Sequence, residues 1–171
     1  MSLDTHQSVY RERLLEHVLI AELLKHSWLE HSAEMEVSKP EVDRAGYDVI
    51  LEARGIVRHV QLKSSTLAAK TARQKVHFDL ASKPSGCIVW SRFEEKTLSL
   101  SPFYFFGSGP GRPLPCLNEL PIAKHTKGNS VGVKALRPNI RVISQGKFEV
   151  LESIADLYDK LFVEGSSHNR N

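Results

Sequence analysis

Two short apolar runs are joined by a turn in the segment Gly46-Tyr47-Asp48-Val49-Ile50-Leu51-Glu52-Ala53-Arg54-Gly55-Ile56-Val57-Arg58-His59-Val60-Gln61-Leu62-Lys63. Glycine adopts the backbone conformations that a tight hairpin needs, so we expect Arg54-Gly55 to be a two-residue loop. Counting outward from that loop places Asp48 directly opposite Gln61. Because side chains alternate along a strand, Gln61 and Lys63 share one face. Three polar groups therefore converge at one end of a predicted β-ribbon, which is the arrangement of a functional site.

The size and composition of the chain predict one globular domain. Of its 171 residues, 41% are hydrophobic and 25% are charged, which are ordinary values. We expect a single domain over residues 1–164 and a disordered polar tail over residues 165–171. No apolar run approaches the roughly 20 residues that cross a bilayer, and the N-terminus has no signal-peptide pattern. Cys87 and Cys116 are too few for a disulfide framework, so we expect a cytoplasmic protein with no membrane partner.

Basic residues are unevenly distributed along the chain. Residues 1–52 contain eleven acidic residues and five Lys or Arg, whereas residues 53–78 and 120–148 each contain six bases and no acid. Acid-free basic segments suit binding to a polyanion. The alternative is a solvated surface neutralised by the acidic N-terminal third. The candidate nucleic-acid-binding residues are Lys70, Arg73, Lys75, Lys124, Lys127, Lys134 and Arg137.

The remaining pattern predicts a helix at each end of the chain and strands between them. The first helix, over residues 9–28, is apolar around most of its circumference, as expected for a largely buried helix. The further elements are strands around 35–37, 87–90 and 140–143, a return strand at 97–100, and a closing helix over 150–162. The aromatic run Phe103–Phe106 suits the core or a covering flap, and base stacking is the alternative.

Glu16 lies on an apolar face of the first predicted helix. A carboxylate in that position is costly unless it is paired or bound to a metal. A salt bridge to Arg13 or to another base is the simpler interpretation. The loop 124–129 combines cations, a hydroxyl and a glycine, so it suits contact with phosphate. An ordinary exposed loop is the alternative there.

The order of these elements resembles the PD-(D/E)XK, or restriction-endonuclease-like, nuclease superfamily. The resemblance covers residues 9–66, follows the order of elements to about residue 100, and rests on Glu16, Gly46-Tyr47-Asp48 and Gln61-Leu62-Lys63-Ser64-Ser65. It implies an α/β fold with a central mixed β-sheet flanked by helices. The N-terminal helix, the β-ribbon that carries the motif and the C-terminal helix are its main parts. Tyr47 stands where members of the superfamily often have proline.

The resemblance also implies a role for each matching residue. Asp48 would be the central metal-binding carboxylate, and Glu16 would be an additional acid from the helix. Lys63 would be the motif lysine. Gln61 occupies the position usually held by Asp or Glu and offers a neutral amide oxygen, although active members with glutamine exist. The backbone carbonyl of Leu62 would complete the ligands of Mg²⁺ or Mn²⁺.

These residues predict metal-dependent hydrolysis of phosphodiester bonds in DNA. A bound Mg²⁺ supplies Lewis acidity and an activated water, and Lys63 can orient that water and offset phosphate charge. A homodimer would suit the cutting of both strands of a duplex. One alternative is a nucleic-acid-binding protein that keeps the fold without activity, which Gln61 favours. Another is a partner subunit that docks through Phe103–Phe106. For the site itself, the alternative is that Asp48 and Lys63 form only a cross-strand salt bridge.

Overall fold

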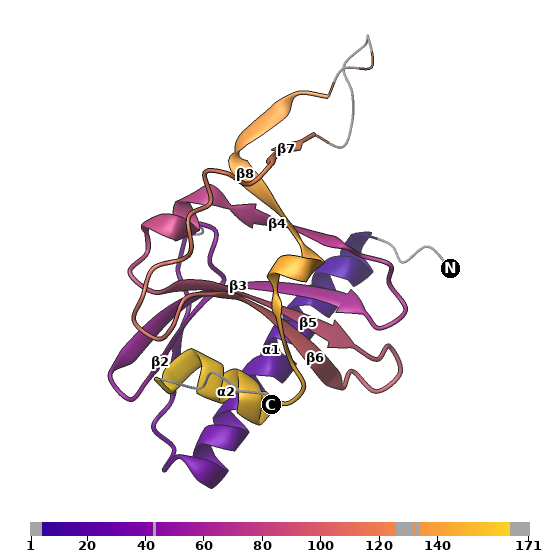
Figure 1. The fold of residues 1–171 in the computed structure, drawn as a ribbon. Helices are drawn as coiled ribbons and strands as arrows, with labels where there is room; N and C mark the ends of the chain where they lie inside the picture. The colour runs from indigo at the N-terminus through magenta and orange to yellow at the C-terminus, as the bar shows by residue number, and fades with distance from the viewer. Residues whose placement is uncertain (1–4, 43, 126–131, 133, 165–171) are drawn as a thin grey trace, which may run out of the picture.

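A six-stranded mixed sheet forms the centre of the computed structural model (Figure 1), which describes residues 5–42, 44–125, 132 and 134–164. Its strand order is β1-β2-β3-β5-β6-β9; β3 and β5 are parallel, and the other neighbours are antiparallel. The strands are β1 Glu36–Ser38, β2 Val49–Ala53, β3 Ile56–Thr66, β5 Gly86–Phe93, β6 Leu100–Gly107 and β9 Glu149–Leu151. Flanking helices complete the predicted α/β fold, which is confirmed.

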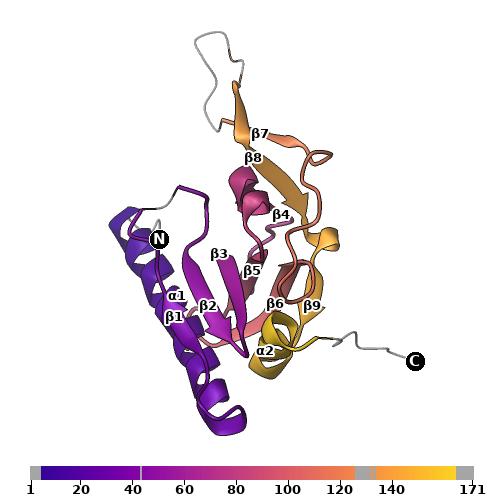
Figure 2. The same ribbon diagram turned by 90° about the vertical axis from the view of Figure 1, so that its left-hand side faces the viewer.

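Two helices cover one face of this sheet (Figure 2). Leu19 and Leu23 of α1 (Thr5–Glu30) pack with Leu157 of α2 (Ile154–Phe162) against the sheet. The closing helix starts later than predicted, because residues 150 and 151 belong to β9 and pair with β6. A capping box at Ser153 fixes the actual start of α2. In the described part of the chain, no helix has both the length and the apolar character required to cross a membrane.

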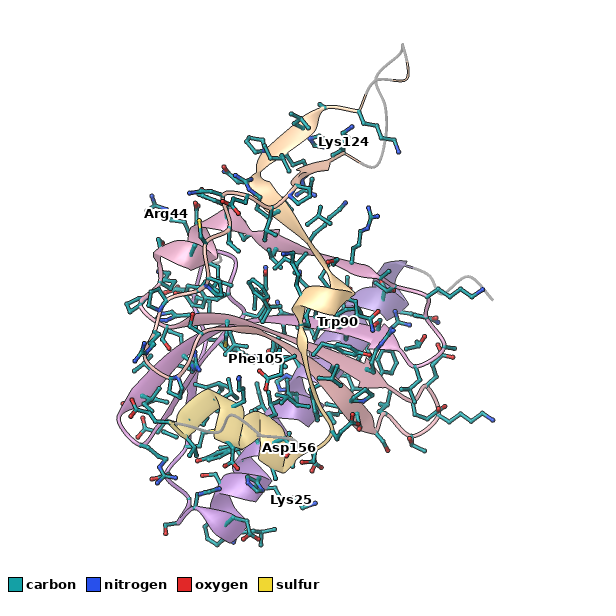
Figure 3. All side chains as sticks on the ribbon, viewed as in Figure 1. Lys25, Arg44, Trp90, Phe105, Lys124 and Asp156 are labelled. Atoms are coloured by element: carbon teal, nitrogen blue, oxygen red, sulfur yellow. The ribbon has the colours of Figure 1, made fainter. Side chains whose placement is uncertain are left out.

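A second, three-stranded sheet covers the opposite face. Its strands are β4 Arg73–His77, β8 Leu136–Ser144 and β7 Ile122–Lys124, in the order β4-β8-β7, and the short 3-10 helix η1 (Phe78–Ser82) follows β4. Trp90 belongs to the core on this side, whereas Phe105 belongs to the core on the helix side; Figure 3 labels both. Every residue of β5 is buried, because this strand has packed layers on both faces.

The aromatic run Phe103–Phe106 belongs to the core, as one of the sequence interpretations stated. Phe103 and Phe105 are buried towards the helices, while Tyr104 and Phe106 pack into the core on the other face. The predicted return strand at 97–100 is wrong in its boundaries. Residues 95–97 form a turn in which Leu98 N donates to Glu94 O at 2.8 Å, and β6 begins only at residue 100.

Arg58 ties α2 to the central sheet from a fully buried position on β3. Its Nε donates to Leu161 O at 2.9 Å, and its Nη2 donates to Ser108 O and Lys160 O at 3.1 and 3.2 Å. The carbonyl groups at a helix C-terminus carry partial negative charge, so they suit a guanidinium. Burial nevertheless lowers the pKa of Arg58. These bonds fix the end of α2 against the edge of the hairpin.

Strand β8 is shared by two partners. Its C-terminal half pairs with β4, from Arg73 opposite Ser144 to His77 opposite Ile140. Its N-terminal half pairs with β7, and this part projects beyond the rest of the molecule in Figures 1 and 2. We call residues 122–125 and 134–139 the arm.

Candidate active site

The hairpin that carries the predicted motif has the register deduced from the sequence. Ala53 pairs with Ile56, and the last pair of the ladder is Val49 with Val60. Both loop residues 54 and 55 have positive φ, at 56° and 74°, as in the two-residue turns that favour hairpins. Asp48 lies one position beyond the last pair, and its N–H donates to Val60 O at 2.9 Å. Asp48 and Gln61 are therefore neighbours across the ribbon.

The Asp48 carboxylate is fixed against the edge of β3. Strand β3 continues to Thr66, well past the point where β2 begins. Asp48 Oδ2 accepts a hydrogen bond from Leu62 N at 2.6 Å and so satisfies a backbone donor that β2 does not reach. A carboxylate that accepts a backbone N–H in this way is held in one orientation.

A cavity of about 490 Å³ lies beside this carboxylate, between α1 and the continuing part of β3. Its polar lining comes from several elements that are distant in sequence. The polar lining residues are Glu12, Arg13 and Glu16 from α1, Asp48 before β2, Lys63 and Ser64 from β3, Gln74 from β4 and Ser91 from β5. The structure therefore brings three of the four predicted catalytic side chains to one cavity.

Glu16 is both buried and paired. It is 8% exposed, and its Oε2 accepts from Arg13 Nη1 at 3.2 Å. Its Oε1 accepts from the ammonium group of Lys39, which follows β1. The predicted salt bridge to Arg13 is thus present, and a second cation joins it. A metal ion at this carboxylate would have to compete with two positive side chains.

The Gln61 side chain makes its contact with the second sheet. Its Oε1 accepts from His77 N on β4 at 3.3 Å, and Gln61 is absent from the lining of the cavity. The side chain is only 8% exposed, so its amide needs an internal partner. An amide oxygen has two lone pairs, so the bond to His77 leaves acceptor capacity on this oxygen.

The donor atoms around the cavity suit a hard divalent cation. Asp48 and Glu16 supply carboxylate oxygens, and Mg²⁺ prefers oxygen ligands while retaining several waters. Within the described ranges, no three His, Cys, Asp or Glu side chains come together as a metal-binding group. Two carboxylates with a backbone carbonyl and waters form a sparse but chemically suitable set for Mg²⁺ or Mn²⁺.

A polar cluster that the sequence did not predict lies around Tyr47 and His59. The two rings meet edge to face with centroids 5.0 Å apart, and Lys83 Nζ lies 5.1 Å from the centroid of Tyr47. Burial lowers the pKa of His59, and the nearby Lys83 lowers it further. His59 Nδ1 is buried and finds no hydrogen-bond partner among the described residues. His59 is therefore neutral near pH 7.

The predicted nucleic-acid-binding residues gather on the second sheet and its loops. Arg73 and Lys75 are exposed on β4, and Gln74 between them lines the cavity, so the basic strand borders the candidate site. Lys127 lies outside the described residues. The other exposed members of the set are Lys70 and Lys134 in adjoining loops, Lys124 on β7 (labelled in Figure 3) and Arg137 on β8.

Two side chains at the cavity, and a third that pairs with Glu16, had no signal in the sequence. Ser91 reaches it because β3 and β5 pair in parallel with Ser64 beside Ser91. Gln74 reaches it from the second sheet, and Lys39 reaches Glu16 from the segment after β1. Each contact depends on tertiary packing, so no local spacing could indicate it.

Comparison with known proteins gives little further information. No protein-family model matches the chain, and no curated protein matches it. One solved structure that is similar is a bacterial homing endonuclease, I-Ssp6803I, with 22% sequence identity. The alignment covers 77% of this chain and 86% of that chain, with a TM-score of 0.36. A similarity of this size does not establish a family.

Proposed function

We propose that this chain is a metal-dependent endonuclease of the PD-(D/E)XK type that hydrolyses phosphodiester bonds in DNA. The observation that supports this most directly is the shared cavity, where Glu16, Asp48 and Lys63 meet although they come from separate elements. A simple cross-strand salt bridge between Asp48 and Lys63 would not require the additional carboxylate from α1. The oxygen donors beside a lysine are the groups that phosphodiester hydrolysis needs.

In this proposal, the ligands of Mg²⁺ or Mn²⁺ are the side-chain oxygens of Asp48, Glu16 and Gln61 and the backbone carbonyl of Leu62. A metal ion bound there supplies Lewis acidity and lowers the pKa of a bound water. The bond from Leu62 N to Asp48 holds the central carboxylate in place before any substrate arrives. Gln61 would use the lone pair that His77 N leaves available.

Lys63 acts on the phosphate in the same proposal. Lys63 lines the cavity, and its ammonium group would donate to a non-bridging phosphate oxygen and orient the attacking water. During hydrolysis the water oxygen forms a bond to phosphorus while the bond from phosphorus to one sugar oxygen breaks. Negative charge develops on the phosphate and on that leaving oxygen, and a fixed cation stabilises both.

The substrate assignment rests on the exposed basic residues of β4, the strand from which Gln74 reaches the cavity. Arg73 and Lys75 on β4 are exposed next to Gln74, which lines the cavity. Contacts of this kind position a nucleic-acid backbone without reading its sequence. Two copies of the chain, each with one cavity, would cut both strands of a duplex.

The test is cleavage of supercoiled plasmid, single-stranded DNA and branched DNA with Mg²⁺ or Mn²⁺. We expect cutting that EDTA abolishes and that falls by at least about 100-fold in Asp48→Asn and in Lys63→Met. Lys96→Met, in the exposed turn between β5 and β6, is the matched control and should cut at the wild-type rate. Cutting that persists in EDTA, or in both cavity variants, would contradict the proposal.

A non-catalytic DNA-binding protein on the same fold is the second candidate. Two observations favour it: Gln61 is bonded to His77, and Glu16 is already neutralised by Arg13 and Lys39. This candidate predicts a gel shift with DNA, no cutting of any substrate and no binding of Mn²⁺ by calorimetry. Binding of Mn²⁺ that Asp48→Asn removes would exclude it.

A further inference from the structure

We propose that the arm enters the major groove of B-form duplex DNA and reads base edges there. The inference rests on the proposed function, because it specifies the form of nucleic acid that the protein engages. It goes further in assigning sequence recognition to a part of the molecule that the candidate active site does not include.

The arm projects from the body and carries only basic charge. Figure 1 shows β7 and the N-terminal half of β8 extending beyond the six-stranded sheet and β4, away from α2. The sequence contains no acidic residue from Leu120 to Phe148. The exposed polar side chains of the arm are Lys124, His125, Lys134, Arg137 and Asn139. A projecting, acid-free element of this kind is complementary to a polyanion.

The geometry of the arm selects duplex DNA over duplex RNA. It is an antiparallel two-stranded ribbon in which Ala123 pairs with Arg137, and His125 N donates to Ala135 O at 2.9 Å. The major groove of B-DNA is about 12 Å wide and admits a two-stranded ribbon, whereas the minor groove is about 6 Å wide. In A-form RNA the major groove is too deep and narrow for side chains to read.

The side chains of the arm match the groups that the major groove displays. The guanidinium of Arg137 suits the O6 and N7 acceptors of guanine, and the amide of Asn139 suits N6 and N7 of adenine. Ile122 and Leu136 are 40% and 56% exposed. Apolar contact with the methyl group of thymine gives Leu136 a partner, because Leu136 pairs with Lys124 in the outer part of the arm.

An irregularity at the base of the arm separates the exposed part from the packed part. Ile122 and Ala123 are adjacent, yet their partners Arg141 and Arg137 are four positions apart. Pro138 lies in this interval, where a residue without an N–H interrupts the ladder at no further cost. Arg141 is buried, with its Nη1 donating to Pro138 O and its guanidinium 4.4 Å from the ring centroid of Phe78. Arg141 therefore anchors the arm, and the residues beyond the irregularity are available to DNA.

The test is a binding selection from a randomised duplex library in EDTA, where no metal-dependent cutting occurs. We expect enrichment of a sequence that contains guanine. Replacing that guanine with 7-deazaguanine, which lacks the N7 acceptor, should weaken wild-type binding by between about 5-fold and about 150-fold. The same replacement should have no further effect on Arg137→Ala. Lys96→Ala, a base outside the arm, should behave as wild type.

Three results would overturn the inference: no enriched sequence, equal affinity for duplex RNA of that sequence, or sensitivity to inosine without sensitivity to 7-deazaguanine. Inosine removes only the minor-groove amino group of guanine, so that last result would place the contact in the minor groove. Sensitivity to 7-deazaguanine without any DNA cutting would keep the arm assignment and reject the nuclease. Cutting without that sensitivity would do the reverse.

Discussion

At the scale of single residues, His59 has an environment that should make folding depend on pH. Its ring lies against the ring of Tyr47, which is the residue immediately before Asp48. Lys83 extends over the Tyr47 ring as well. Burial is the main cause of the lowered pKa of His59, and the positive charge of Lys83 adds to it. Protonating His59 in the folded protein would place a second positive charge in this cluster.

We predict that the free energy of unfolding falls at acidic pH, in part because His59 takes up a proton. Since the folded pKa lies below the unfolded value near 6.5, the unfolded chain takes up a proton that the folded protein resists. The contribution of neutral His59 to the free energy of unfolding is therefore complete above about pH 6.5. It declines as the pH falls from there to the pKa of His59 in the folded protein. Urea unfolding at about pH 7 and about pH 5 should show a smaller acid loss in His59→Gln than in wild type. The exposed His17→Gln is the control, and equal losses in all three proteins would refute the prediction.

The sequence predicted the location of Asp48 better than that of the Gln61 amide. The position of Asp48 follows from counting along one hairpin, and the ladder has that register. The bond from Gln61 to His77 depends on how β4 packs across β3, which is a tertiary contact. Local periodicity specifies which face a side chain occupies, but a partner from another sheet determines where its polar atoms point.

At the scale of elements, the motif hairpin has one glycine before its first strand and one in its turn, with nearly the same backbone conformation. Gly46 has φ +72° and Gly55 has φ +74°. A Cβ atom at Gly46 would lie 2.1 Å from His77 Cβ, whereas a Cβ at Gly55 would meet nothing within 4 Å. The two positions therefore separate the cost of backbone strain from the cost of steric overlap.

We predict that Gly55→Ala lowers the free energy of unfolding by about 1–2 kcal/mol, from the left-handed backbone alone. Gly46→Ala should lower it by about 2–5 kcal/mol, because His77 and β4 must also move. Urea denaturation measures both values. Asn tolerates this conformation better than Ala, so Gly55→Asn should cost less than Gly55→Ala. Equal losses of unfolding free energy in the two alanine variants would contradict this prediction, because they would show that moving His77 and β4 has no energetic cost.

The elements that the sequence located correctly are those with a strong local pattern. The helix over 9–28, the strand at 87–90 and the strand at 140–143 all lie within elements of that type. The errors occur where a partner strand determines the boundary. Leu151 lies in β9 opposite Phe103. The apolar pattern that predicted a helix over 150–162 therefore includes a residue that belongs to a strand.

At the scale of the whole molecule, the central sheet joins two cores into one structure. Val89 packs on the helix side and Trp90 on the other side of the same strand. The N-terminal helix and the C-terminal helix meet on one face of this sheet. Loss of either core would expose a face of β5, so we expect the two cores to unfold together.

We therefore predict a single cooperative unfolding transition, in agreement with one domain over residues 1–164. In Trp28→Phe, fluorescence reports only on buried Trp90, while circular dichroism reports mainly on the two helices. The two urea transitions should coincide in midpoint and slope. A separate, earlier loss of the Trp90 signal would show that the second sheet is an independent unit.

The arrangement of the basic residues was only partly foreseeable from the sequence. The two acid-free segments are far apart in the chain, and the pairing of β4 with β8 brings them onto one sheet. Charge composition indicated a polyanion-binding face. It could not show that one part of this face borders the cavity while the other projects away from it.

Strand β8 has a mechanical consequence for a DNA-cutting protein. The strand runs from Ser144, opposite Arg73 beside the cavity, to Leu136 on the arm, so a single continuous backbone spans both regions. In the proposed nuclease, this connection would keep a constant number of base pairs between the bases that are recognised and the bond that is broken. Cut positions would then stay at one offset from the recognised bases, whatever the sequence between them.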